Sequence, residues 1–131
     1  MPTPLNLASS ALVGFVSIND PAKALAFYRD TLGLTLIQDQ TPFALVFDAN
    51  GTMIRATFAG GFKPQPFTIL GWQVTDIEST VQALTDAGVV FNRYTGMNDA
   101  DPLGIWSAPG GTKVAWFQDP FGNVLSLQQG V

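Results

Sequence analysis

The chain has few residues able to do chemistry, and two residue types that dominate catalytic sites are missing. Its 131 residues include no histidine and no cysteine. Histidine-based triads, thiol nucleophiles, zinc–thiolate sites and disulfides are therefore excluded. Ser126, in the stretch DPFGNVLSLQQ, is a single hydroxyl among the apolar residues of a predicted strand, but no histidine base exists to activate it. We interpret Ser126 as a pocket hydroxyl or a core residue.

Aromatic side chains form the second group of candidates, because a flat ring can stack on a planar ligand. Trp72 and Trp116 each sit in a dense apolar run and fit a core position equally well. Trp106 follows the polar loop TGMNDADPLG (95–104) and is the best aromatic candidate for a ligand site. Asp99 and Asp101 in that loop fit a solvated surface, with capture of a cation as the alternative.

Composition limits the class of protein and its partners. Apolar residues make up 47% and charged residues 12%, as expected for one globular domain over 1–131. The net charge is −4 with six basic residues that do not cluster, so neither nucleic acid nor membrane is an expected partner. A neutral or cationic small molecule fits better.

The start of the chain lacks a signal-peptide pattern and an apolar span, which predicts a cytoplasmic protein. So low a charge content also favours a homodimer.

Strand and helix signals occur twice in the same order. In the first half, a run rich in Val, Ile and Phe precedes Asn19-Asp20-Pro21, which is typical of a helix start. The segment AGGFKPQPF (59–67) breaks every periodicity and is interpreted as a linker. The predicted elements are strands 11–18, 34–39, 43–49 and 52–58 around a helix 21–33, then strands 68–74, 89–94, 105–109, 113–119 and 123–129 around a helix 77–88.

The repetition can be aligned residue by residue. Ile18-Asn19-Asp20 matches Val74-Thr75-Asp76 at an offset of about 56 residues, and the turn ending at Gly51 matches the turn ending at Gly122 at an offset of about 71. The sequence therefore predicts an α+β fold of two βαβββ modules, 11–58 and 68–129. Two such modules joined edge to edge would form a U-shaped cleft.

These residues resemble the vicinal oxygen chelate superfamily of glyoxalases, bleomycin resistance proteins and extradiol dioxygenases. The resemblance is carried by three stretches: FVSINDPAKALAFYRDTLGL (15–34), GWQVTDIESTVQALTDAGV (71–89) and FQDPFGNVLSL (117–127). It implies the two-module fold with a cleft, and it adds to the expectation of a dimer.

The same resemblance implies a divalent metal held at four strand positions, two in each module. Carried over one at a time, these positions are Val13, Arg55, Ile69 and Ser126. Two apolar side chains, a guanidinium and a hydroxyl lack the anionic oxygens or imidazoles that divalent ions require. We therefore expect no metal and no other cofactor, in a fold that has kept its shape and lost the family's metal ligands.

Strand alternation extends the cleft around these four positions. Phe15 lies on the face of Val13, Gln73 on that of Ile69, and Gln128 on that of Ser126. The resemblance places Arg55 on the cleft face, where it would bind a carboxylate or phosphate, or else form a structural ion pair. The predicted ligand-binding residues are Phe15, Arg55, Gln73, Trp106, Ser126 and Gln128.

Three kinds of function remain open. The first is a metal-independent protein that sequesters or senses a small molecule in the cleft, and it is the interpretation we prefer. The second is a metal-free enzyme, such as a lyase, isomerase or oxygenase-like protein, with Arg55 as electrostatic stabiliser and a carboxylate or tyrosine as acid or base. The third is an interaction protein whose cleft is filled by its own side chains.

Overall fold

A computed structural model describes residues 6–130; Met1 to Leu5 and Val131, which belong to the predicted domain 1–131, lie outside the described residues. Strands dominate, with short helical segments in the first half and one longer helix in the second. The elements are η1 (Leu7–Ser9), β1 (Val13–Ile18), α1 (Pro21–Ala24), η2 (Leu25–Thr31), β2 (Thr35–Gln40), β3 (Ala44–Ala49), β4 (Thr52–Phe58), β5 (Thr68–Gln73), α2 (Ile77–Asp86), β6 (Trp106–Ser107), β7 (Lys113–Gln118) and β8 (Val124–Gln129).

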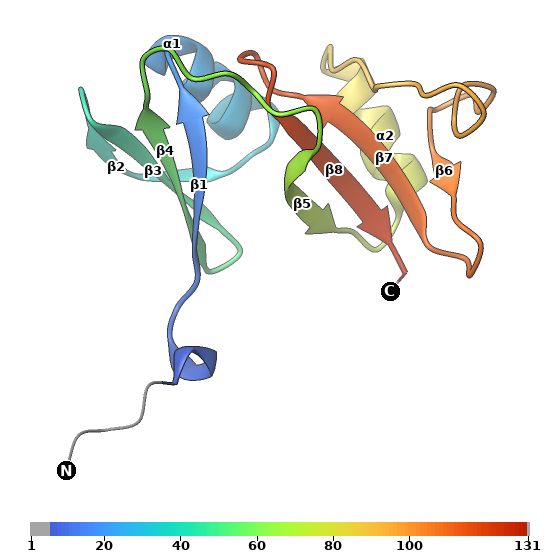
Figure 1. The fold of residues 1–131 in the computed structure, drawn as a ribbon, viewed down its shortest axis with the longest axis horizontal. Helices are drawn as coiled ribbons and strands as arrows, with labels where there is room; N and C mark the ends of the chain where they lie inside the picture. The colour runs from blue at the N-terminus through green and yellow to red at the C-terminus, as the bar shows by residue number, and fades with distance from the viewer. Residues whose placement is uncertain (1–5, 131) are drawn as a thin grey trace.

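The strands form two four-stranded sheets with the same connectivity. Sheet 1 has the order β1-β4-β3-β2 and sheet 2 the order β5-β8-β7-β6 (Figure 1). In each sheet the first strand of the module pairs in parallel with the last, and the other pairs are antiparallel. This arrangement confirms the predicted α+β fold of two βαβββ modules.

The first helix begins and ends where its sequence dictates. Asp20 accepts a hydrogen bond from the Lys23 backbone N–H at 3.1 Å, and Pro21 occupies the first turn, where its missing N–H costs nothing. α1 then widens into the π-helical η2, in which the Leu32 N–H reaches back five residues to the Phe27 carbonyl. Gly33 stops the helix with a positive φ of 81°.

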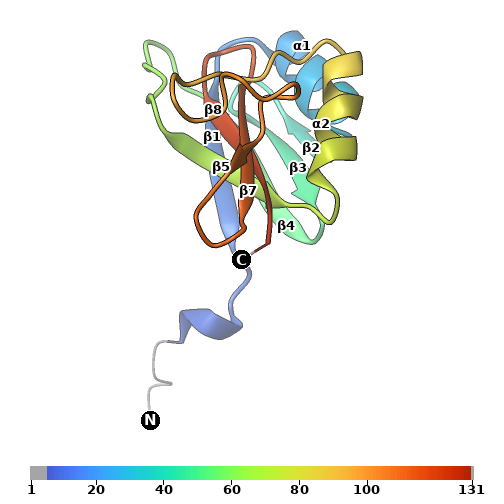
Figure 2. The ribbon, with the colours of Figure 1, turned by 90° about the vertical axis from the view of Figure 1, so that its right-hand side faces the viewer.

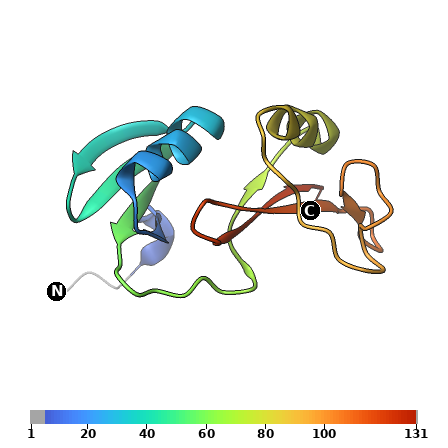
Figure 3. The ribbon, with the colours of Figure 1, turned by 90° about the horizontal axis from the view of Figure 1, so that it is seen from above.

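The helical side of each module is buried against the other module. Phe27 from η2 packs on Phe117 from β7 of the other module, with ring centroids 6.3 Å apart, and Tyr28 packs on Phe47 of its own module at 5.8 Å. One continuous cluster of buried residues includes side chains from both sheets. Seen from above, α1 and α2 lie on one side of the molecule and the linker 59–67 crosses on the other (Figure 3). The opposite faces of the two sheets, here called the free faces, are left outside this core.

A buried carboxylate joins the modules within this core. The Tyr28 hydroxyl donates to Asp119 Oδ2 at 2.5 Å, and the Asn123 amide donates to Asp119 Oδ2 at 2.8 Å and to the Ser17 carbonyl of β1 at 2.9 Å. Asp119 Oδ1 accepts from the backbone N–H groups of Phe121 and Asn123, each at 2.9 Å. Asp119 thus closes its own turn and fixes that turn to the first module.

The predicted strand over 89–94 is wrong. Only Phe91 bridges to Phe117, and the chain then leaves sheet 2. The reason is Asn98, whose side chain accepts from the Tyr94 N–H at 2.7 Å and donates to the Asn92 carbonyl at 2.9 Å. A side chain thus supplies hydrogen bonds that a neighbouring strand would otherwise make.

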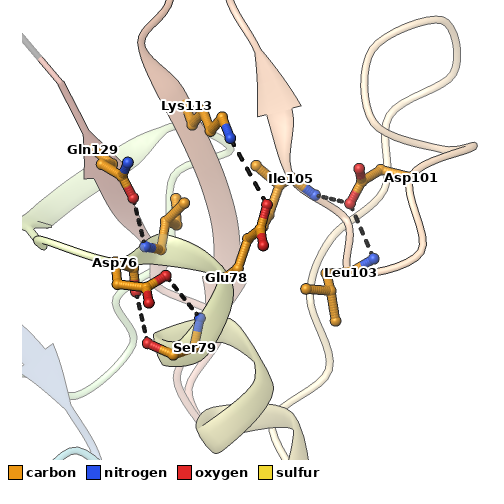
Figure 4. Close-up of polar contacts among 9 residues, drawn as sticks. Asp76, Glu78, Ser79, Asp101, Leu103, Ile105, Lys113 and Gln129 are labelled. Atoms are coloured by element: carbon orange, nitrogen blue, oxygen red, sulfur yellow. Dashed lines mark hydrogen bonds and ion pairs between the residues drawn. The ribbon is translucent and has the colours of Figure 1, made fainter.

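Helix α2 is fixed at its first turn by sheet 2. Asp76 caps the helix by accepting from the Ser79 N–H at 3.2 Å, and the Gln129 side chain accepts from the Ile77 N–H at 2.7 Å (Figure 4). Lys113 of β7 pairs with Glu78 at 3.8 Å. The end of β8 and the start of β7 therefore position the helix.

The segment before β1 stands away from the rest of the chain. Figures 1 and 2, seen from perpendicular directions, both show residues 6–12 extending beyond the two sheets. Asn6 caps the short η1 turn by accepting from the Ala8 N–H, while Leu7 and Leu12 are exposed. Two leucines therefore project from the chain without a core to cover them.

The Tyr28–Asp119 contact gives a test of the fold. Replacing Tyr28 with Phe removes one donor from a buried carboxylate and is expected to lower the free energy of unfolding by about 1–3 kcal/mol at neutral pH. Urea unfolding measures the loss. Arg29→Ala, which removes only an exposed contact with Asp30, is the matched control and is expected to change stability by less than about 0.5 kcal/mol.

The same pair predicts a pH dependence. Burial, with the charge and hydrogen bond of Asp119, raises the pKa of Tyr28 far above its ordinary value. The stability that Tyr28 contributes is therefore complete below about pH 10, where an unfolded tyrosine is neutral, and is lost above it as the unfolded state ionises. The difference between the wild type and Tyr28→Phe should shrink above about pH 10; a difference that grows there would contradict the assigned contact.

Candidate free-face site

The core leaves the free faces of the two sheets available, and alternation determines which side chains they carry. In β1, Val16 and Ile18 are buried in the core, whereas Val13 and Phe15 are exposed on the free face. In β8, Leu125 and Leu127 join the core, which puts Ser126 and Gln128 on the other face.

On sheet 1 the structure brings Phe15 and Arg55 together. They are register partners on β1 and β4, and Arg55 also lies opposite Val46 of β3. Phe15 is 62% exposed, and Arg55 is half-buried. A guanidinium beside an exposed aromatic ring can hold an anionic or planar group, as predicted for this position.

On sheet 2 the structure brings Ser126, Gln73 and Gln128 together. The Gln128 amide donates to Gln73 Oε1 at 3.0 Å, and Ser126 lies opposite Trp116 of β7 and Gly71 of β5. Ser126 is only 8% exposed, and a Cβ added to Gly71 would lie 2.8 Å from its Oγ. The glycine therefore leaves just enough room for the serine hydroxyl, which makes Ser126 a packed group at the base of the face.

Trp106 lies on the same sheet but further out, on the edge strand β6. Its ring lies 6.0 Å from that of Trp116, and Trp116 in turn meets Tyr94 edge to face at 5.4 Å. The predicted ligand residues thus fall into two groups: Phe15 and Arg55 on sheet 1, and Gln73, Trp106, Ser126 and Gln128 on sheet 2. No hydrogen bond or strand pairing among the described residues joins the two groups.

The four positions that correspond to metal ligands do not fit a metal. Val13 and Ile69 are apolar, Arg55 is cationic, and the β-bulge between Thr68 and Leu70 takes Ile69 out of the regular pairing. Within residues 6–130, no group of three or more His, Cys, Asp or Glu side chains is placed to hold an ion. The donor set present is chemically unsuited to divalent cations.

An aromatic hollow opens on the free face of sheet 2. Its volume is about 300 Å³, and Trp116 and Tyr94 form part of its wall. The remaining lining residues are Pro66, Phe67, Thr68, Met97 and Val124. No sequence pattern joins the linker to the loop 95–104, so Phe67 and Met97 are absent from the predicted site. What these residues share is a large apolar side chain that is exposed, and only the structure reveals that exposure.

The loop behind this hollow is held by a buried asparagine and an exposed arginine. Asn98 is 1% exposed, and besides its two contacts with the 92–94 backbone it donates to the Gly104 carbonyl at 2.7 Å. The Arg93 guanidinium donates to the backbone carbonyls of Asn98, Asp99, Asp101 and Pro102. The backbone that carries Tyr94 and Met97 is therefore held by hydrogen bonds with the Asn98 and Arg93 side chains.

Two other hollows contain charged groups, which already have partners. In the hollow of about 250 Å³ beside α2, Asp101 accepts from the Leu103 and Ile105 N–H groups, and Lys113 pairs with Glu78 (Figure 4). In the hollow of about 410 Å³ near the module junction, Asp119 is occupied by the contacts described above. The charged side chains in both hollows therefore serve contacts within the fold.

Comparison with known proteins identifies the class defined by these paired βαβββ modules. Residues 11–127 match the model of the Glyoxalase/Bleomycin resistance protein/Dioxygenase superfamily. The chain belongs to this superfamily. No curated protein matches it.

Solved structures share the fold at low sequence identity. A putative glyoxalase family protein from Bacillus anthracis superposes with a TM-score of 0.75 at 18% identity, covering 100% of both chains. Lactoylglutathione lyase from Agrobacterium tumefaciens gives 0.72 at 16% identity, covering 98% of this chain and 96% of that one. TioX from Micromonospora sp. ML1 gives a TM-score of 0.70 at 15% identity, covering 94% of this chain and 100% of that one.

Among the described residues, no helix has the length and apolar character needed to cross a membrane.

Asn98 is the residue through which the loop can be tested. Asn98→Ala leaves the Tyr94 N–H and the Asn92 and Gly104 carbonyls without their partner, so the free energy of unfolding should fall by about 1–3 kcal/mol. Amide exchange should also quicken across 93–104. Thr95→Ala, at an exposed position of the same loop, should change neither quantity. Unchanged exchange in Asn98→Ala would show that the side chain does not hold the loop.

Proposed function

We propose that this superfamily member binds a small molecule without a metal or cofactor, in the cytoplasm, and that it sequesters or senses that molecule rather than transforming it. The observation that carries the proposal is the free face of sheet 2. There an aromatic hollow at the Thr68–Val124 end of β5 and β8 is lined by Trp116, the register partner of Ser126, and by the neutral hydroxyls of Thr68 and Tyr94. Gln73 and Gln128 lie at the other end of the same strands. Apolar walls with a few polar groups are typical of small-molecule sites.

The chemistry of the site supports binding over catalysis. At the four family ligand positions stand Val13, Arg55, Ile69 and Ser126, whose side chains do not fit a divalent ion and so cannot support metal-assisted chemistry. In the core, Tyr28 and Asp119 could in principle act as acid and base. Both are buried, however, and their hydrogen bonds hold the turn and the module junction. A metal-free enzyme using Arg55 is the alternative.

A homodimer is the second part of the proposal. Val13, Phe15 and Met53 are exposed together on sheet 1, and the exposed Leu7 and Leu12 precede them in the chain. An apolar sheet face of this kind is rarely left to water, and a second copy is the simplest cover. A second copy laid on this face would also enclose Arg55.

The absence of a metal and the role of Arg55 are tested together. Elemental analysis of the purified protein should find no stoichiometric Zn, Ni, Fe or Mn, and a chelator should not change the thermal midpoint. A thermal-shift screen of aromatic cations, glycopeptides and small carboxylates should yield at least one stabilising compound. Any stabilisation by carboxylates should disappear in Arg55→Ala.

A bound transition metal in stoichiometric amount would overturn the metal-independent function. Stabilisation by carboxylates that survives in Arg55→Ala would remove Arg55 from the site while leaving the binding function in place. Turnover of a screened compound that is lost in Arg55→Ala would favour the enzyme.

The dimer is tested by light scattering after size exclusion. The wild type should have the mass of two chains, and Phe15→Asp should shift the population toward one chain, because a carboxylate would be buried in the apolar contact. Val90→Asp, at an exposed apolar position away from sheet 1, serves as the control. Circular dichroism verifies that both variants fold. A dimer that tolerates Phe15→Asp would place the contact elsewhere.

A further inference from the structure

We propose that the hollow on the free face of sheet 2 recognises a flat aromatic molecule that carries a positive charge. The inference rests on the proposed binding function and names the chemical class of its ligand. It concerns Phe67, Tyr94, Met97 and Trp116, together with the loop that holds two of them.

Exposed apolar side chains gather around this one space. Phe67 is 60% exposed and Met97 44%, and both line the same hollow of about 300 Å³ with Tyr94 and Trp116. Phe67 and Met97 come from segments far apart in sequence, the end of the linker and the loop after Phe91. A volume near the lower limit of ligand pockets, walled mainly by rings, suits a molecule of a few fused rings.

Two of the three aromatic rings of the hollow, those of Trp116 and Tyr94, are held by neighbouring side chains. Trp116 is flanked by Tyr94 at an interplanar angle of 82° and by Trp106 at 33°, and the Asn92 amide donates to the Tyr94 hydroxyl at 3.2 Å. Asn98 and Arg93 fix the loop backbone beneath Tyr94 and Met97. Side chains that are already held by contacts lose little conformational entropy on binding, which favours stacking on these two rings.

The charge around the hollow favours a cation. None of the seven lining residues is charged, and the faces of Trp, Tyr and Phe rings attract cations. The loop after Met97 carries Asp99, whose carboxylate accepts from the Gly96 N–H at 3.1 Å, while the guanidinium of Arg93 is turned onto backbone carbonyls. Lys63 of the linker is exposed and does not line the hollow. With a net charge of −4 for the chain, an aromatic cation is favoured over an aromatic anion.

The test compares two flat probes of nearly equal shape by calorimetry on the full chain. 9-Aminoacridine, a planar cation, should bind saturably, and 9-anthracenecarboxylate, a planar anion, should bind at least about tenfold more weakly. Phe67→Ala should weaken 9-aminoacridine binding about tenfold or more, as loss of a stacking ring does elsewhere. Phe43→Ala removes a similarly exposed phenylalanine at the β2–β3 turn and should leave the affinity unchanged. Met97→Ala provides a second variant on the loop side.

Several outcomes would overturn the inference. Equal affinity for the two probes would remove the charge preference, and binding that is unaffected by both Phe67→Ala and Met97→Ala would move the site elsewhere. Light scattering on the same variants tests a further outcome. If Phe67→Ala dissociates a dimer, the hollow is covered by a second copy and not by a ligand.

The ligand class and the proposed function fail in distinguishable ways. If neither probe binds while the thermal-shift screen finds a ligand that depends on Arg55, the aromatic class is wrong and the binding function stands. If neither probes nor screen give any ligand, both are wrong.

Discussion

Asp119 is the group on which the arrangement of the two modules depends. It is 5% exposed, and its carboxylate is held by neutral donors: a tyrosine hydroxyl, an asparagine amide and two backbone N–H groups. A buried charge is tolerated only when its lone pairs are occupied, so the contact is demanding in geometry. Because Tyr28 belongs to the first module and the turn to the second, satisfying one carboxylate fixes the position of one module on the other.

That junction determines which surfaces remain for function. By bringing η2 against β7, it buries the helical sides of both modules together and leaves the free faces pointing outward. Arg55 lies on sheet 1 and Ser126 on sheet 2, in keeping with the two positions in each module that the resemblance implies. The superfamily fold is kept, but the chemistry available on each face is local: a cation beside a ring on sheet 1, and rings beside amides on sheet 2.

Much of the fold could be predicted from local signals in the sequence. Asp20-Pro21, Asp76 and Gly33 define helix ends by backbone chemistry that acts over a single turn, and alternation correctly separated Val16 from Phe15. The repeat revealed the second module because it follows the same rules.

What the sequence could not show depends on contacts between distant segments. The strand expected over 89–94 was lost to Asn98, whose side chain competes for backbone groups that no propensity scale assigns to it. The aromatic hollow joins residues 66–68 to Tyr94 and Met97 across a helix and a turn, and no periodicity links those positions. Trp106, chosen because it follows the loop, packs beside Trp116 and does not line the hollow.

The way Arg93 holds the loop 93–104 has a consequence for how this protein can change. Its guanidinium recognises main-chain carbonyls, which every residue type provides. Substitutions at exposed loop positions such as Thr95, Met97 or Ala100 therefore leave the loop's shape intact while altering what it presents. The shape of the loop and the chemistry of its exposed surface can therefore vary independently of each other.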